Sequence, residues 1–145
     1  MTPTIKQTTL EKILKLHKSI PEFRNDPTKE FKERLKGKKK LILVAVLNKK
    51  PAGYLIGYAA NKSTFYIWRA GVIPRYRRKK AMTALMDYTE KWAKEKGYKK
   101  INIKTRSTRK AQLANLLKRK YSLVKMETGQ TTSTKRIYFE KGLLK

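Results

Sequence analysis

The chain has 145 residues, which is the length of one domain with an ordinary hydrophobic core. It contains no cysteine, and this excludes disulfides, thiolate metal sites and cysteine nucleophiles. Its 38 lysines and arginines outnumber its 10 aspartates and glutamates, and the resulting formal charge of +28 attracts anions and repels cationic ligands.

Two helices are predicted at the N-terminal end of the chain. Apolar residues recur at helical spacing over residues 10–16 behind two threonines that can cap a helix, and Pro21 ends this segment. A second helix is predicted to begin with Asp26 as its N-cap and Pro27 as its first residue, and to end at Gly37.

Three strands in series are predicted next. Residues 41–47 form a continuous run of apolar residues that favour a strand, residues 48–51 turn the chain, and residues 52–59 return it. Residues 64–72 follow after a second short loop. Strands joined by loops this short form an antiparallel meander.

The periodicity then changes to that of a helix. Apolar residues three and four apart predict an amphipathic helix over about residues 80–96, with Gly97 as its left-handed cap. Four further elements, a strand, a helix and two strands, are predicted around residues 101–103, 111–117, 121–126 and 136–139. The helix between the third and fourth strands makes that pair parallel in a mostly antiparallel sheet, so we expect an α+β fold of three layers, a mixed sheet flanked by helices.

The junction between the third predicted strand and the following helix carries the clearest functional signal. A tight loop that enters a helix leaves several backbone amides without intrahelical partners, and the helix dipole adds positive potential there. Basic side chains crowd the same loop, namely Arg75, Arg77, Arg78, Lys79 and Lys80. This combination predicts a site for a phosphate-bearing ligand.

The same junction resembles motif A of the GNAT superfamily of N-acetyltransferases. Residues 72–77, read as V-x-P-x-Y-R and followed by a basic loop and an amphipathic helix, are similar to the family pattern V-x-P-x-y-R-x-x-G-x-G/A. Residues 52–54, 96–98 and 116–121 resemble further family segments in the expected order, so the resemblance covers about residues 40–143.

The resemblance implies a GNAT fold and acetyl-coenzyme A (acetyl-CoA) as co-substrate. In the family, the loop amides hold the pyrophosphate of coenzyme A, and the strand end pairs with its pantetheine arm. Carried over to this chain, the cofactor-binding residues are Val72, Ile73, Arg77, Arg78, Lys79, Lys80, Ala81 and Met82. The resemblance also implies that the strand that ends at Val72 splays from the strand after it and that this opening admits the cofactor. Gly71 either forms a bulge there or is a glycine that a strand end tolerates.

The chain departs from the family pattern at the loop and at the catalytic positions. Lys80 and Met82 stand where the family has its two loop glycines. A glycine lets the backbone approach phosphate closely, and Lys80 is predicted to bind phosphate through its charge instead. The general-acid tyrosine of the family falls at Leu116, the third strand lacks the glutamate of many relatives, and His17 is expected to be packed or solvated. Catalytic residues therefore stay unassigned, and three tyrosines remain open as proton donors or packed aromatics, Tyr66, Tyr121 and Tyr138.

Two functions follow from these observations. The first is an N-acetyltransferase that acts on an amine of unknown identity, in which Arg77→Glu weakens coenzyme A binding. The second is a catalytically degenerate GNAT domain that binds nucleic acid or another polyanion. The positive charge of the protein disfavours cationic acceptors and favours amines attached to anionic molecules such as nucleic acid. A cationic acceptor would need a local acidic patch, for which the candidate residues are Asp87, Glu90, Glu127 and Glu140.

The sequence pattern also predicts where the protein works. No apolar segment of a secretory signal follows Met1, and no apolar run is long enough to span a bilayer. We therefore expect a cytoplasmic protein with no membrane partner, consisting of a single domain over residues 1–145.

Overall fold

The structure is a computed structural model that describes residues 2–25, 27–78, 80–128 and 135–143. Within these ranges the α-helices are α1 (Leu10–Lys18), α2 (Lys29–Leu35), α3 (Ala81–Glu95) and α4 (Lys110–Lys118), with short 3-10 helices η1 (Pro21–Phe23) and η2 (Pro74–Tyr76). The strands are β1 (Thr4–Gln7), β2 (Lys40–Leu47), β3 (Lys50–Ala59), β4 (Thr64–Val72), β5 (Lys100–Arg106), β6 (Ser122–Thr128) and β7 (Lys135–Gly142).

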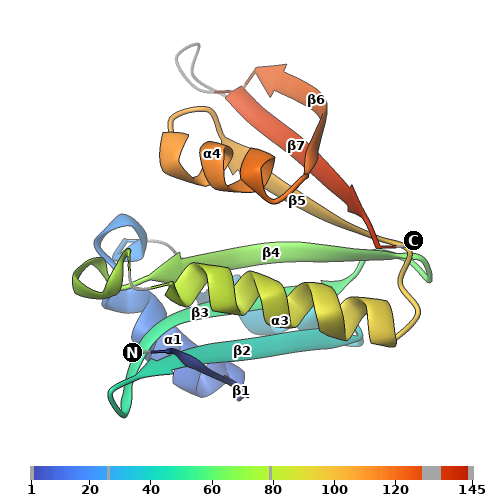
Figure 1. The fold of residues 1–145 in the computed structure, drawn as a ribbon. Coiled ribbons are helices and arrows are strands. Elements are labelled where there is room, and N and C mark those ends of the chain that lie inside the picture. The colour runs from blue at the N-terminus through green and yellow to red at the C-terminus, as the bar shows by residue number, and fades with distance from the viewer. Residues whose placement is uncertain (1, 26, 79, 129–134, 144–145) are drawn as a thin grey trace.

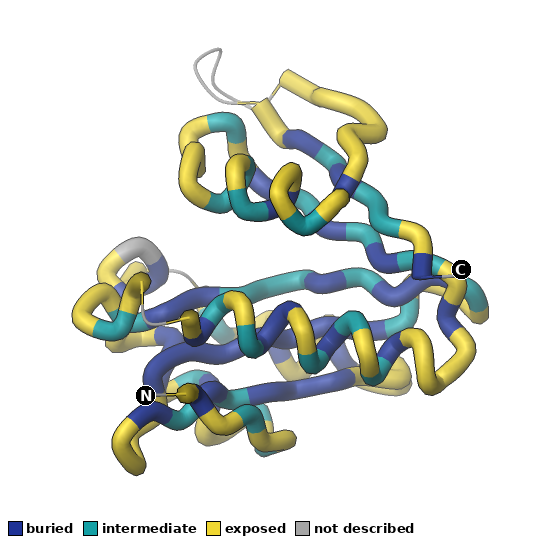
Figure 2. Tube along the Cα trace, viewed as in Figure 1, coloured by how far each residue is buried: buried dark blue, intermediate teal, exposed yellow. Residues whose placement is uncertain are grey.

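The described strands form one sheet in the order β1-β2-β3-β4-β5-β7-β6. The β4–β5 pair is parallel and the other pairs are antiparallel, as predicted. Apolar residues of α3 and α4 pack on one face, and those of α1 and α2 pack on the other, which gives the three predicted layers (Figure 1). The buried positions accordingly concentrate in the central strands and on the inner faces of the helices (Figure 2).

Three local predictions were wrong. The edge strand β1 was missed, because its sequence T-I-K-Q is short, mostly exposed and not apolar. Helix α2 begins at Lys29 and not at Pro27. Its buried side chains are Phe31 and Leu35, so the residues before Lys29 would gain no packing energy by joining the helix. Asp26, its predicted cap, lies outside the described residues. Pro51 lies in β3, because the hairpin turns tightly at Asn48 and Lys49, both with positive φ (53° and 65°).

Strands β4 and β5 separate halfway along their length. They pair only from Thr64 with Lys100 to Ile67 with Ile103. Beyond this point β4 continues along β3, and β5 continues along β7 (Figure 1). The splay that the family resemblance implied is therefore present, and it opens the sheet between β4 and β5.

The bulge in β4 lies at Trp68 and not at Gly71. Ile56 and Gly57 of β3 face Arg69 and Ile67, which leaves Trp68 as the extra residue. A glycine is needed at position 71 for a different reason, because a Cβ added there would lie 2.5 Å from Cε2 of Phe23 in η1. The glycine lets η1 pack closely on the strand.

Helices α3 and α4 are each followed, two residues after their last residue, by a residue with positive φ. Gly97 (φ 92°) follows α3, as predicted, and the Tyr98 amide donates to the Ala93 carbonyl at 3.0 Å. Lys120 (φ 74°) takes the same position after α4, and the Tyr121 amide donates to a carbonyl one turn back at 2.9 Å. A lysine thus occupies a position that favours glycine.

Lys120→Gly is therefore expected to raise the free energy of unfolding by about 1 kcal/mol, because glycine adopts positive φ without a steric cost. Urea denaturation measures the change. The matched control is Lys118→Gly, which removes the same charge but lies inside α4, and it is expected to lower stability by up to about 1 kcal/mol. Equal losses from both substitutions would contradict the assignment of the cap.

Candidate functional site

The end of β4 is tied both to the neighbouring strand and to the loop after it. The Ile73 amide donates to the Ala52 carbonyl at 2.8 Å, which keeps the strand end next to β3. The Arg77 side chain returns to the same strand end, because its Nε donates to the Val72 carbonyl at 3.0 Å. The loop between β4 and α3 is thus closed by a side chain that the sequence analysis had assigned to the cofactor.

The entrance to α3 uses two left-handed residues that are not glycine, Arg78 (φ 65°) and Lys80 (φ 64°). Lys80 is the N-cap of the helix, and its carbonyl accepts from the Ala84 amide at 3.0 Å. The amides of Ala81 and Met82 lie in the first turn, where an α-helix offers no carbonyl partner. The chain therefore keeps, without glycine, the backbone form that glycine favours.

A cavity of about 150 Å³, which we call the loop cavity, lies at this entrance. Its lining includes most of the residues predicted to bind the cofactor, and consists of Val72, Tyr76, Arg77, Arg78, Lys80, Ala81, Met82 and Thr83. Ile73 is the exception, because its side chain packs with the apolar cluster on the α1 side of the sheet. Lys79 lies outside the described residues. Three cations and a helix N-terminus make the loop cavity suitable for phosphate.

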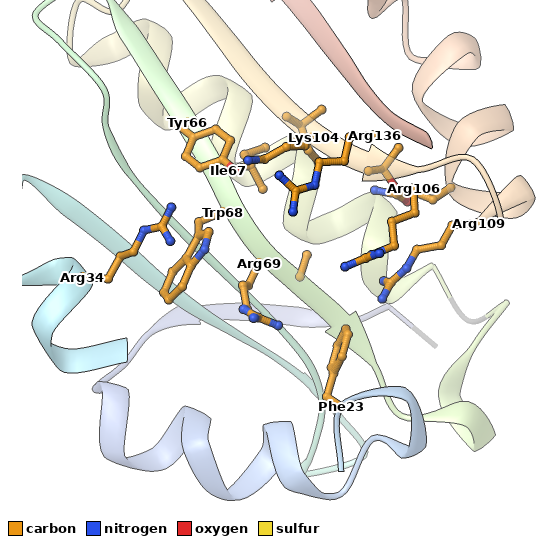
Figure 3. Close-up of a pocket in the computed structure, with 14 residues that line it drawn as sticks. Phe23, Arg34, Tyr66, Ile67, Trp68, Arg69, Lys104, Arg106, Arg109 and Arg136 are labelled. Carbon is orange, nitrogen blue, oxygen red and sulfur yellow. The ribbon is translucent and has the colours of Figure 1, made fainter. Parts of the chain in front are cut away.

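A second cavity, of about 430 Å³, lies where β4 and β5 have separated, and we call it the splay cavity (Figure 3). Six of the residues that line it carry a positive charge, namely Arg34, Arg69, Lys104, Arg106, Arg109 and Arg136. None of the lining residues in the described part of the chain is acidic. This cluster is not recognisable in the sequence, because its members come from α2, β4, β5, the loop before α4, and β7.

Aromatic rings lie beside four of these cations. The distances from cation to ring centroid are 5.0 Å for Arg34 and Trp68, 5.0 Å for Arg69 and Phe31, 5.4 Å for Lys104 and Tyr138, and 5.3 Å for Arg109 and Phe23. A ring attracts a cation through its quadrupole and carries no net charge. These contacts therefore position the cations without cancelling their charge.

The splay cavity changes the proton affinity of its own side chains. Burial, then the charges of Arg136 and Arg34, lower the pKa of the Lys104 ammonium. Burial, then the neighbouring Tyr58, raises the pKa of Tyr66 to about 12. Tyr66 therefore keeps its proton at neutral pH and is a weaker acid than an ordinary tyrosine.

The other catalytic candidates from the sequence are held by structural contacts. His17 is buried, stacks on Phe23 with centroids 4.9 Å apart, and has Nδ1 2.6 Å from the Tyr54 hydroxyl, so of the two expected alternatives, packed or solvated, it is packed. Leu116, at the family's general-acid position, is fully buried. The Tyr121 hydroxyl donates to Glu90 at 2.9 Å, and burial with the Glu90 charge raises the pKa of Tyr121.

The acidic candidates do not form a patch for a cationic acceptor in the described part of the chain. Each has a cationic partner, which is Arg119 for Asp87 (2.7 Å) and for Glu90 (3.1 Å), Lys125 for Glu127 (3.1 Å), and Lys100 for Glu140 (3.3 Å). Within the same residues, His, Asp and Glu side chains nowhere gather into a metal site. No described helix is long and apolar enough to cross a membrane.

Comparison with known proteins agrees with this architecture. The sequence pattern of the acetyltransferase (GNAT) family matches residues 10–120. Among curated proteins, none matches the chain in sequence.

Solved structures share the fold at low sequence identity. Ard1 from Thermoplasma volcanium is 15% identical with a TM-score of 0.83 over 100% of both chains. The ribosomal-protein-S18-alanine N-acetyltransferase from Escherichia coli is 16% identical with a TM-score of 0.83 over 98% of this chain and 94% of that chain. A GNAT family acetyltransferase from Elizabethkingia anophelis, solved with acetyl-CoA bound, is 19% identical with a TM-score of 0.76 over 97% of each chain.

These likenesses confirm the GNAT fold that the sequence resemblance implied. Because the family pattern spans well over half of the sequence and the splayed strands agree with it, the chain belongs to the acetyltransferase (GNAT) family.

Proposed function

We propose that this acetyltransferase moves the acetyl group of acetyl-CoA to an amine that binds in the splay cavity. The observation that carries the proposal is the position of β4, which contributes to both cavities. Val72 lines the loop cavity, and residues 67–70 line the splay cavity. A donor and an acceptor held in these two places lie against the same strand, which favours transfer between them.

The residues of the loop cavity fit coenzyme A. Arg77, Arg78 and Lys80 bring positive charge to the N-terminus of α3, where a pyrophosphate finds both charge and unpaired amides. Lys80 would act as a point-charge ligand in place of the glycine of the family pattern. The Elizabethkingia anophelis relative, which holds acetyl-CoA on the same fold, supports this assignment.

The chemistry requires the acceptor amine in its neutral form. An acceptor ammonium therefore first gives one proton to water. The neutral amine then attacks the acetyl thioester of acetyl-CoA, which forms an amide and releases the thiol. The splay cavity favours the neutral amine, because the burial and the positive charges that lower the pKa of Lys104 act on an acceptor ammonium in the same way. This effect acts in the same direction as a carboxylate base, which β4 does not supply.

A second candidate function is polyanion binding by a GNAT domain that does not transfer acetyl groups. The buried Leu116 at the general-acid position and Lys80 in place of a loop glycine favour it. This function predicts binding to DNA or RNA that weakens by about a thousandfold between 50 and 200 mM salt when six or more phosphates are contacted. It also predicts no saturable binding of acetyl-CoA.

Calorimetric titration with acetyl-CoA tests the proposal. We expect micromolar affinity, with Lys80→Gln weakening it by at least about tenfold because a charge-assisted contact to phosphate is lost. Lys80→Gly is expected to restore part of the affinity, because glycine relieves the left-handed backbone and lets phosphate approach more closely.

The matched control is Lys62→Gln, an exposed charge in the loop before β4, at the opposite end of that strand from the loop cavity. It is expected to leave acetyl-CoA affinity unchanged. Absence of heat at millimolar acetyl-CoA would overturn the proposal in favour of polyanion binding without transfer.

A further inference from the structure

We propose that the amine acceptor carries phosphate groups and that the cations of the splay cavity bind them. This inference rests on the proposed function and adds the class of the acceptor to it. The cations are Arg34, Arg69, Lys104, Arg106, Arg109 and Arg136. Figure 3 shows them arranged around the gap, with Arg69 on β4 and Lys104, Arg106 and Arg136 on the other side.

Most of this charge has no anionic partner among the residues that the structure describes. In the described residues, Arg34, Lys104 and Arg136 form no ion pair, and the same holds for Arg106 and Arg109. The nearby carboxylate whose charge acts on the Lys104 ammonium is that of Glu127, and it already pairs with another lysine at 3.1 Å. The splay cavity therefore has a net positive charge that an anionic ligand would compensate.

Aromatic rings hold four of these cations in place before any ligand binds, namely Arg34, Arg69, Lys104 and Arg109. Arg34 lies over Trp68 and Arg109 lies over Phe23, so packing against a ring limits the motion of each guanidinium. A guanidinium presents a planar fork of donors that matches the oxygens of phosphate. Positioned arginines that keep their full charge are what recognition of phosphate requires.

The same field opposes acceptors that are purely cationic. An ammonium that enters the splay cavity meets six positive side chains, and like charges raise the cost of binding it. Phosphate groups on the same molecule offset this cost by compensating the cations, while burial still favours the neutral form of the amine. One carboxylate compensates only one charge, so the number of cations favours phosphate over a single carboxylate.

The first test measures binding to the protein saturated with coenzyme A, so that a phosphate probe does not bind in the loop cavity. The probes are ethanolamine, β-alanine and O-phosphoethanolamine, which present an amine alone, an amine with a carboxylate and an amine with a phosphate. We expect O-phosphoethanolamine to bind at least about 100-fold more tightly than ethanolamine, with β-alanine between them, because two charge-assisted contacts contribute about tenfold each. The kcat/KM for acetylation is expected to follow the same order.

Single substitutions distinguish binding in the splay cavity from binding in the loop cavity. Arg136→Gln and Lys104→Gln are each expected to reduce the preference for phosphate about tenfold without changing the affinity for acetyl-CoA. Lys80→Gln is expected to show the opposite pattern. Lys62→Gln serves as the charge-matched control, and thermal unfolding of each variant verifies that it is folded.

A further arm distinguishes two sources of the phosphate. If an aminoacyl-tRNA is acetylated far more efficiently than O-phosphoethanolamine, with a rate that falls steeply with salt, the phosphates belong to a nucleic acid. If the small molecule is preferred, they belong to a phosphorylated metabolite; both results support the inference.

Equal binding and acetylation of ethanolamine and O-phosphoethanolamine by a protein that binds acetyl-CoA would overturn the inference and leave the proposed function intact. Loss of acetyl-CoA binding itself would overturn the proposed function, and the inference with it. The calorimetric titration detects this second case independently.

Discussion

Replacing Glu90 by alanine is expected to lower the free energy of unfolding by about 3 kcal/mol, because it leaves Lys141, whose side chain is only 24% exposed, without its carboxylate and takes one of two carboxylates from Arg119. Glu90 lies on α3 and accepts from Lys141 of β7 at 2.8 Å and from Tyr121 at 2.9 Å. It also lies 3.1 Å from Arg119 at the end of α4. The network thus ties α3 to β7 and to the end of α4, in a chain whose net charge of +28 opposes compaction.

The matched control is Asp87→Ala, on the same helix. Asp87 contacts only one member of the network, Arg119 at 2.7 Å, and its side chain is 65% exposed compared with 15% for Glu90. Exposed ion pairs contribute little, so this loss is expected to stay below about 1 kcal/mol. Urea denaturation compares the two variants. Equal effects would show that the buried network does not hold the two parts of the sheet together.

Gly57→Ala is expected to lower the free energy of unfolding by about 3 kcal/mol through overpacking. A Cβ at Gly57 would lie 2.4 Å from Cε2 of Phe65 and 2.8 Å from the Tyr66 carbonyl oxygen. The ring of Phe65 is fully buried and is packed against Trp92 and Tyr98, with centroids 5.2 Å and 5.4 Å away. Neither the backbone nor the ring can move aside without disturbing the core.

Two further variants test this explanation by thermal or urea denaturation. Gly142→Ala introduces a methyl group where no atom lies within 4 Å, and its effect is expected to stay within about 0.5 kcal/mol. Phe65→Leu removes the ring that the new methyl group would meet, so the double variant with Gly57→Ala is expected to lose less stability than the sum of the single losses. Strict additivity would rule out the clash as the cause.

The order of the elements and the family were predictable from the sequence because they depend on local patterns. The change from strand to helix periodicity after Val72 located both α3 and the loop before it. The Gly97 cap and the parallel β4–β5 pair followed from equally local signals, a glycine at a helix end and a helical crossover. In each case residues close in the sequence determine their own backbone geometry.

Tertiary structure decided which distant side chains share a cavity. Arg34, Lys104 and Arg136 come from α2, β5 and β7, and nothing in their local sequence distinguishes them from the other basic residues. The splay between β4 and β5, the bulge at Trp68 and the strand register bring them to one place, and all three depend on packing between elements. The sequence by itself determined that the protein is strongly basic and has a GNAT fold. Only packing decided that cations gather in the splay cavity, because proximity across a sheet depends on register and not on periodicity.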